Sequence, residues 1–338
     1  MVEITPELQA QLDEQKKQCI FCKITEGQQE GKKVYEDDLV MGILDINPST
    51  EGHTIFYPKA HFPIMPYLPP ETFKQIFGYM PKWVNAVKTA IVATGANVFI
   101  ANGGVAGQQA PHFLVHVIPR DNEDGLSCFD LNKNNATSKK ETEQMLSQNI
   151  PIMMKNHFGR NPAPWHKENP VAETVQELDG RTPIYQDEKA TVCISKNPQA
   201  DGHLVIYPNT NIPFEQLDKE TSSHLFFVAS FCATAVFEGL GAQGTNILLR
   251  TGESIDNPSG KTSIEILPRH PEDGNDMTWQ PKKVDLDPIA EKISDEMFII
   301  ENEKEENIPE KEEETTITKK DLSPMQQEIQ KAIETLKE

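Results

Sequence analysis

Two histidines near the middle of the first half of the chain are spaced as neighbours on one face of a strand. The segment QAPHFLVHVIPRD begins at Gln109 and places His112 and His116 on either side of Leu114. Because side chains two apart in an extended strand share a face, we expect these three to line up together. Imidazole can bind a metal or a phosphate, whereas leucine can do neither. The pattern predicts a chemical site whose central position is inert.

A cysteine pair lies upstream of this segment. The sequence CIFC gives Cys19 and Cys22 the CxxC spacing, which by itself fits a redox pair, half of a metal site or two unrelated thiols. A thioredoxin-like pair needs a strand before the motif and a helix after it, and that context is absent. A zinc site needs two further ligands. The natural candidates are His61 and His112, and the set of four favours a structural zinc site.

A glycine-rich segment, ANGGVAGQQ, comes just before the two histidines. Its glycines allow close approach of the backbone, and Asn102 and Gln108 offer amide donors, a combination that suits a phosphate. It is not a Walker loop, because no Gly-Lys-Ser/Thr follows. A plain hairpin turn is the alternative interpretation.

The elements that must position these residues occur twice. The segment VYEDDLVMGILDINPSTEGHTIFYP from Val34 aligns without a gap with IYQDEKATVCISKNPQADGHLVIYP from Ile184. After a one-residue deletion the match resumes at Leu68 over Leu217 and continues to VIPRDNEDG over ILPRHPEDG. This repetition predicts two copies of one domain.

Each copy has the pattern of an α+β domain, a mostly antiparallel sheet with one long helix. The helix is predicted from apolar residues three or four apart, and Pro81 is expected to kink or split it. In the first copy the strands are predicted at 33–36, 39–46, 53–58, 97–102 and 112–119. The predicted domains are an N-terminal helix (1–18), the first copy (19–121), a connector with a helix (122–170), the second copy (171–280) and an acidic, largely disordered tail that could end in a helix (281–338).

Composition excludes several function classes. The chain has 338 residues and a net charge of −20, which disfavours a protein that coats nucleic acid. No signal segment begins the chain, and the apolar run 225–237 is predicted to be a buried helix, so we expect no membrane association. Five cysteines without a signal segment favour reduced thiols and a cytoplasmic location.

Taken together, the motifs resemble those of the histidine-triad (HIT) family. The family signature is His-φ-His-φ-His-φ-φ after an Asn-x-Gly and Ala-Gly-Gln loop, preceded by DI-x-P and GHTLVIPK-x-H. This chain has LDINPSTEGHTIFYPKAH, ANGGVAGQQ and HFLVHVIPR in the same order and spacing. The resemblance covers 19–121 closely and 182–275 as a degenerate copy, a layout also similar to galactose-1-phosphate uridylyltransferase.

The resemblance implies a role for each matching residue. Zinc would be held by Cys19, Cys22, His61 and His112. A nucleotide would contact Asp45 through its ribose, Phe21, Ile24 and Ile46 through its base, and Asn102, Gln108 and His116 through its α-phosphate. The implied fold pairs two such domains, which a tandem chain would satisfy internally; a further oligomer stays open.

The middle histidine of the triad is the family's nucleophile, and here that position is Leu114. Leucine has no lone pair to attack phosphorus, and His116 lies one side-chain pair further along the strand, too far for a near-attack geometry. The second copy carries Lys261, Ser263 and Glu265 at the three triad positions, so it offers no substitute.

Three hypotheses follow. In the first, the protein is a zinc-containing nucleotide-binding protein, a pseudoenzyme that binds a nucleotide or a nucleoside phosphate ester without the usual hydrolase or transferase activity. In the second, it remains an active HIT-type hydrolase or nucleotidyltransferase that uses His116 as its catalytic residue. In the third, it is a non-catalytic interaction module, in which the acidic tail would be the functional part.

Overall fold

A ten-stranded sheet dominates the computed structural model, which describes residues 6–129, 136–160 and 181–306. The described residues up to Phe298 form one compact unit. The strands are β1 (Lys33–Glu36), β2 (Val40–Leu44), β3 (Thr54–Pro58), β4 (Gly95–Asn102), β5 (Val115–Arg120), β6 (Tyr185–Gln186), β7 (Ala190–Ile194), β8 (Leu204–Pro208), β9 (Gly244–Gly252) and β10 (Ser263–Arg269).

The sheet has the same strand order on both sides of its centre. Strands β4 and β9 pair antiparallel there, from Gly95 opposite Gly252 to Asn102 opposite Thr245. Going outward, β5, β3, β2 and β1 follow on one side and β10, β8, β7 and β6 on the other. Every strand pair is antiparallel. Together with the helices this confirms the predicted α+β class.

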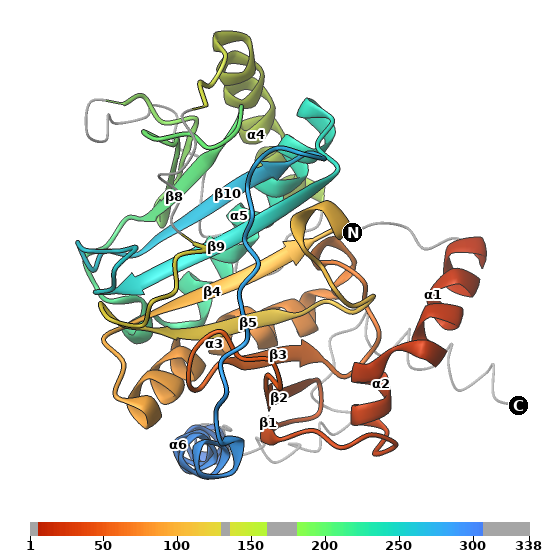
Figure 1. The fold of residues 1–338 in the computed structure, drawn as a ribbon. Coiled ribbons are helices and arrows are strands. Elements are labelled where there is room, and N and C mark those ends of the chain that lie inside the picture. The colour runs from red at the N-terminus through yellow and green to blue at the C-terminus, as the bar shows by residue number, and fades with distance from the viewer. Residues whose placement is uncertain (1–5, 130–135, 161–180, 307–338) are drawn as a thin grey trace, which may run out of the picture. The chain divides into compact units, whose positions relative to one another are not determined.

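Two long helices cover one face of the sheet (Figure 1). They are α3 (Pro70–Ile91) and α5 (Lys219–Leu240), which pack against each other through a stack of Phe77 on Phe226. The other helical segments are α1 (Pro6–Gln18), α2 (Ile20–Thr25), α4 (Lys140–Arg160), α6 (Leu286–Glu306) and the short 3-10 turns η1 (Met65–Tyr67), η2 (Gly104–Ala106) and η4 (Phe214–Gln216).

Helix α5 is long and apolar enough to span a membrane by composition, but 61% of its apolar window is buried in the fold, as in a core helix.

Helix α3 is continuous, so the expectation that Pro81 would split it was wrong. Proline removes the hydrogen bond to the carbonyl four residues earlier, here that of Phe77. The hydroxyl of Ser222 on α5 donates to this carbonyl at 2.6 Å, and Ser222 is fully buried. The neighbouring helix therefore satisfies the group that proline leaves without a partner.

The expected strand 112–119 also differs, because β5 begins only at Val115. The amide of Phe113 donates to the carbonyl of Phe62 in a loop, and the carbonyl of Pro58 at the end of β3 accepts from the ring of His112. The amide of Phe113 and the carbonyl of Pro58 are therefore not available to extend the pairing of β5 with β3. His112 and Leu114 consequently precede the strand that carries His116.

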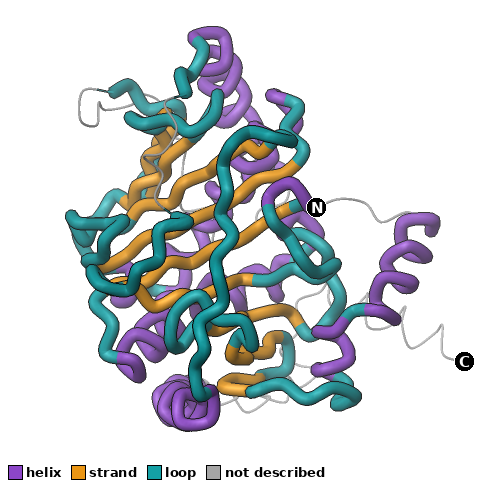
Figure 2. Tube along the Cα trace, in the orientation of Figure 1, coloured by secondary structure: helices purple, strands orange, loops and turns teal. Residues whose placement is uncertain are grey.

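The chain after β10 crosses the face of the sheet opposite the two long helices (Figures 1 and 2). We call residues 270–285 the strap. It is held by the amide of Lys282, which donates to the carbonyl of Pro48 at 2.8 Å, and it leads into α6. Part of the segment expected to be disordered is thus helical, because Ile289, Ile293 and Met297 bury a stripe of side chains four residues apart. The terminal helix expected after Leu322 lies outside the described residues.

Candidate functional site

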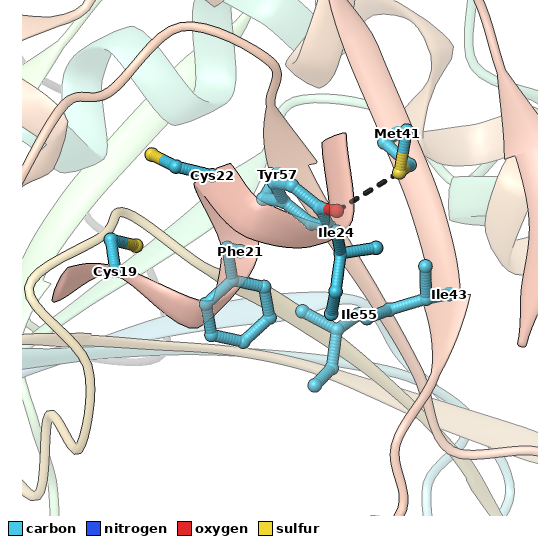
Figure 3. Close-up of a cluster of buried hydrophobic side chains, with 8 residues drawn as sticks. All are labelled: Cys19, Phe21, Cys22, Ile24, Met41, Ile43, Ile55 and Tyr57. Atoms are coloured by element: carbon cyan, nitrogen blue, oxygen red, sulfur yellow. Dashed lines mark hydrogen bonds between the residues drawn. The ribbon is translucent and has the colours of Figure 1, made fainter. Parts of the chain in front are cut away.

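The two predicted cysteines and two predicted histidines converge in one cluster. Helix α2 begins after Cys19 and carries Cys22, and both thiols are buried beside the apolar cluster of Phe21 and Tyr57 (Figure 3). The Sγ of Cys19 lies 3.4 Å from Nδ1 of His112, and the Sγ of Cys22 lies 3.3 Å from Nδ1 of His61. One ligand atom from each of the four lies within 4.8 Å of the others.

The geometry of this cluster suits a tetrahedral metal. Zinc bonds of ordinary length would place thiolate sulfur and imidazole nitrogen about 3.6 Å apart. Three of the four sulfur–nitrogen pairs lie 3.3, 3.4 and 3.7 Å apart. His112 directs its Nε2 at the carbonyl of Pro58 at 2.8 Å, which leaves Nδ1 as the ligand atom. Burial lowers the pKa of His61, and it lowers that of His112 to about 4, so both rings are neutral as ligands must be.

The pKa of the Cys22 thiol is shifted in the opposite direction to that of the two imidazoles. Burial, reinforced by Cys19, raises the pKa of Cys22 to about 12, so without a metal this thiol keeps its proton. None of the five cysteines, all of them among the described residues, is in a disulfide. Two buried cysteines facing two neutral imidazoles are a donor set that a divalent cation would complete.

A cavity of about 500 Å³ opens next to the cluster, on the face that the strap crosses. Seven residues predicted from the sequence line it: Phe21, Asp45, Ile46, Gln108, His112, Leu114 and His116. Leu114 therefore shares one cavity with both flanking histidines, even though the three are not on one strand. Ile24 does not line the cavity; it is buried in the apolar cluster of α2.

The two amide side chains predicted at the phosphate are engaged elsewhere. The Oε1 of Gln108 accepts from the amide of Gly103 at 2.8 Å, while its Nε2 donates to the carbonyls of Pro63 and Ala110. Gln108 thus fastens the glycine-rich loop. Asn102 accepts from the amide of Met65 and lines a separate cavity of about 360 Å³ beside α5.

His116 belongs to a group of three neighbouring side chains, of which the two histidine rings are hydrogen-bonded. Its Nδ1 lies 3.0 Å from Nε2 of His53, whose Nδ1 lies 3.7 Å from the carboxylate of Asp45. Burial lowers the pKa of His53 to about 3, and burial together with His53 lowers that of His116 to about 3. Both rings are therefore neutral at ordinary pH. Asp45 also accepts from the amide of Asn47 at 2.8 Å.

Sequence reasoning missed two side chains of this site. His53 follows Gly52 in a Gly-His pair that both halves contain, so the repeat was a usable signal. Trp279 of the strap also lines the cavity, with its ring centre 5.6 Å from that of His116 and its Nε1 donating to the carbonyl of Asn47. No local pattern predicts this contact, because it joins segments more than 150 residues apart.

The equivalent place in the second half is smaller and charged. A cavity of about 170 Å³ is lined by Ser195, His203, Arg250 and Glu265 among others. Nε2 of His203 lies 3.0 Å from Glu265, and Arg250 pairs with the same carboxylate at 3.3 Å. Burial alone would raise the pKa of Glu265, but His203 and Arg250 together lower it below its ordinary value. A carboxylate thus stands where the first half has His116.

Comparison with known proteins identifies the family of the chain. The model of the HIT domain matches residues 26–123. An uncharacterized HIT-like protein of Borreliella burgdorferi is 39% identical over 136 residues, which are 39% of this chain and 98% of that protein. The chain belongs to the HIT family. Two further HIT relatives are Protein hit of Bacillus subtilis, 41% identical over 30% of this chain and 70% of that protein, and Adenylylsulfatase HINT3 of Arabidopsis thaliana, 35% identical over 38% of this chain and 66% of that protein.

Solved HIT structures also match the chain in part. A HIT family protein from Bacillus anthracis is 38% identical with a TM-score of 0.34, covering 41% of this chain and 95% of that one. A Zn-bound histidine triad family protein from Mycobacterium smegmatis is 37% identical with a TM-score of 0.32, covering 33% of this chain and 81% of that one.

Proposed function

We propose that the chain is a tandem HIT protein whose first half binds a nucleotide or nucleoside phosphate ester without the usual nucleotidyl transfer. The observation that carries the proposal is that Leu114 lines the same cavity as His112 and His116. Asp45 and the apolar Phe21 lie at the same cavity, in keeping with a ribose and a base. With leucine at the nucleophilic position, the protein can hold such a ligand but has no group there to attack phosphorus.

The tandem arrangement is part of this proposal. The identical strand order outward from β4 and β9 supports two copies of one domain that pair within one chain. The second copy would serve as the permanent partner of the first. Its own cavity holds the carboxylate of Glu265, which would repel a phosphate.

We propose zinc as the metal that Cys19, Cys22, His61 and His112 hold. Two thiolates and two imidazoles form a closed, tetrahedral donor set, which is the usual character of a structural rather than a catalytic site. When bound, the ion would supply a cross-link between α2 and the residues that precede β5. The chain's own residues then fix the cavity wall: His112 through the carbonyl of Pro58, and Phe21 through its contact with Tyr57.

The ligand proposal is tested by titrating the protein with AMP, GMP and UMP in a calorimeter. AMP is the first probe because the Arabidopsis relative is named an adenylylsulfatase. In parallel, Leu114→His is assayed for hydrolysis of adenosine 5′-phosphoramidate, with Leu114→Met as the matched apolar control. We expect binding without turnover in the native protein and turnover only in Leu114→His. Absence of binding in both proteins would refute nucleotide binding, and turnover by the native protein would refute the loss of activity.

The zinc proposal is tested by elemental analysis of the purified protein. We expect one zinc per chain, lost in Cys22→Ser and retained in Cys128→Ser, since Cys128 lies outside the cluster. An undiminished zinc content in Cys22→Ser would exclude this site.

A further inference from the structure

One ion pair closes the junction between α3 and the second half of the chain. Nζ of Lys88 on α3 lies 2.5 Å from the carboxylate of Glu215 in η4, and this carboxylate also accepts from the hydroxyl of Thr251 at 3.1 Å. The side chains of Lys88 and Glu215 are 16% and 9% exposed, so the pair is largely buried. The ammonium lies 3.0 Å from the position that a Cβ on Gly252 would take. The lysine therefore fills the space beside this glycine.

The repeat places different residues at the corresponding junction between α5 and the first half. In the alignment of the two copies, Phe237 stands where α3 has its lysine, Pro66 where η4 has its glutamate, and Asn102 where β9 has its threonine. A phenylalanine and a proline cannot form an ion pair. Phe237 and Gly103 both line a cavity of about 360 Å³, so the phenyl ring leaves open the space that the lysine fills in the other half.

The lining of this cavity favours an apolar ligand that is not an anion. Thr245, which is 3% exposed, and Asn102 offer polar contacts at the buried side, where Nδ2 of Asn102 lies 3.4 Å from Oγ1 of Thr245. Among the described residues that line the cavity, Glu238 is the one with a charge, and it is exposed. A carboxylate attracts an ammonium group and repels a phosphate. The apolar walls come from η1 and α5: Ile64, Met65, Pro66, Tyr67, Ala233 and Phe237.

We propose that this cavity is a second ligand site, which takes a small aromatic amine. Cavities of this size with apolar and aromatic walls and a few polar groups are typical of sites for small molecules. The rings of Tyr67 and Phe237 offer faces to an aromatic ligand, and Glu238 offers the counter-charge for its amine. Among the described residues, no lining residue is shared with the cavity of Asp45 and His116, so the site goes beyond the proposed function.

Tryptamine is the probe that tests the charge and the ring together. Its affinity for the native protein is measured by saturation-transfer NMR titration, and indole-3-acetate, which has the same ring and a carboxylate, is the matched anion. We expect tryptamine to bind and indole-3-acetate to bind at least about threefold more weakly. Equal affinities, or no binding of tryptamine, would overturn the proposal.

A double variant closes the cavity with the ion pair of the other half. Phe237→Lys combined with Pro66→Glu should lower the affinity for tryptamine at least about tenfold, because the new side chains fill the space that the ligand needs. Ile152→Lys, which adds a lysine at an exposed position outside the lining, should leave the affinity unchanged. Urea unfolding establishes that the double variant is folded. An undiminished affinity in the folded double variant would refute the site.

Two single changes distinguish this site from the other cavity. Glu238 is exposed, so Glu238→Gln preserves the fold; it should weaken tryptamine binding about two- to fivefold and leave the binding of uncharged indole unchanged. Asp45→Asn removes the carboxylate of the other cavity and should leave the affinity for tryptamine within about twofold of native. A loss in Asp45→Asn without a loss in Glu238→Gln would place the amine in that cavity and refute the proposal. These titrations use no nucleotide, so their outcome is independent of the proposed function.

Discussion

The buried arginine at the end of β5 offers a strong test of how the two halves are joined. The side chain of Arg120 is fully buried and donates to Asp124 at 2.6 Å, while its NH1 pairs at 2.9 Å with Asp256 of the second half. Asp256 is itself 2% exposed. It accepts hydrogen bonds from Asn97 and Ser254, and its second cation, Arg250, lies 3.5 Å away. Arg120→Met keeps much of the side-chain volume but leaves two buried carboxylates without their main cation.

Removing one partner of a buried ion pair typically costs about 3–5 kcal/mol, because the remaining charge stays buried. We expect a loss of that size in the free energy of unfolding of Arg120→Met, measured by urea denaturation. Arg269→Met is the matched comparison: its arginine occupies the equivalent position but pairs with one carboxylate, Asp273, which is 11% exposed. The loss there should be smaller.

The double variant Arg120→Met with Asp256→Asn isolates the pair itself. Neutralising Asp256 removes the buried charge that the first change strands, so the double variant should recover at least about 1 kcal/mol relative to Arg120→Met. A loss below about 1 kcal/mol in Arg120→Met, or strictly additive effects in the double variant, would refute this account of the junction.

Three further predictions concern the fold around the site. The pKa of His53 is about 3 in the folded protein, below its value in the unfolded chain, so the unfolded chain binds a proton that the folded protein does not. The free energy of unfolding should therefore fall as the pH drops below about 6.5. At pH 5 this ring alone should lower it by about 2 kcal/mol, which urea unfolding at pH 7 and pH 5 measures. Gly52 has a φ angle of +79°, and a Cβ added there would lie 2.5 Å from the side chain of Ile91. Gly52→Ala should therefore lower the free energy of unfolding by at least about 1 kcal/mol. An unchanged melting temperature would contradict this steric explanation. Ser222→Ala should lower the free energy of unfolding by about 1–3 kcal/mol in the native protein. The loss should be much smaller in Pro81→Ala, where residue 81 regains an N–H that can bond to the carbonyl of Phe77. Equal losses in the two backgrounds would show that the hydroxyl of Ser222 does not act by satisfying that carbonyl.

Much of the candidate site could be predicted from the sequence. The two cysteines and two histidines that motif and spacing singled out as candidate ligands lie in one cluster, and Asp45, Leu114 and His116 line one cavity. His116 lies on β5, where spacing along the chain becomes spacing in the sheet. The cysteines lie at α2 and meet the histidines only through the fold.

Elsewhere a tertiary contact competes with the local pattern. Pro81 was expected to kink or split its helix; the helix is not split, and a hydroxyl from a helix about 140 residues later satisfies the freed carbonyl. Gln108 has the right chemistry for a phosphate, but its amide is fully engaged by the loop it fastens. Neither the bond to the Phe77 carbonyl nor the contacts of Gln108 can be predicted from the residues adjacent in the sequence.

The sequence by itself determined the α+β class, the cysteine and histidine set that forms one cluster, and the leucine between two histidines, because all three depend on residue identity and short-range spacing. Only the tertiary structure decided that Trp279 lies against the cavity and that His53 comes within hydrogen-bond distance of His116. Both features depend on which distant segments the fold brings together, and the residues adjacent in the sequence do not determine that.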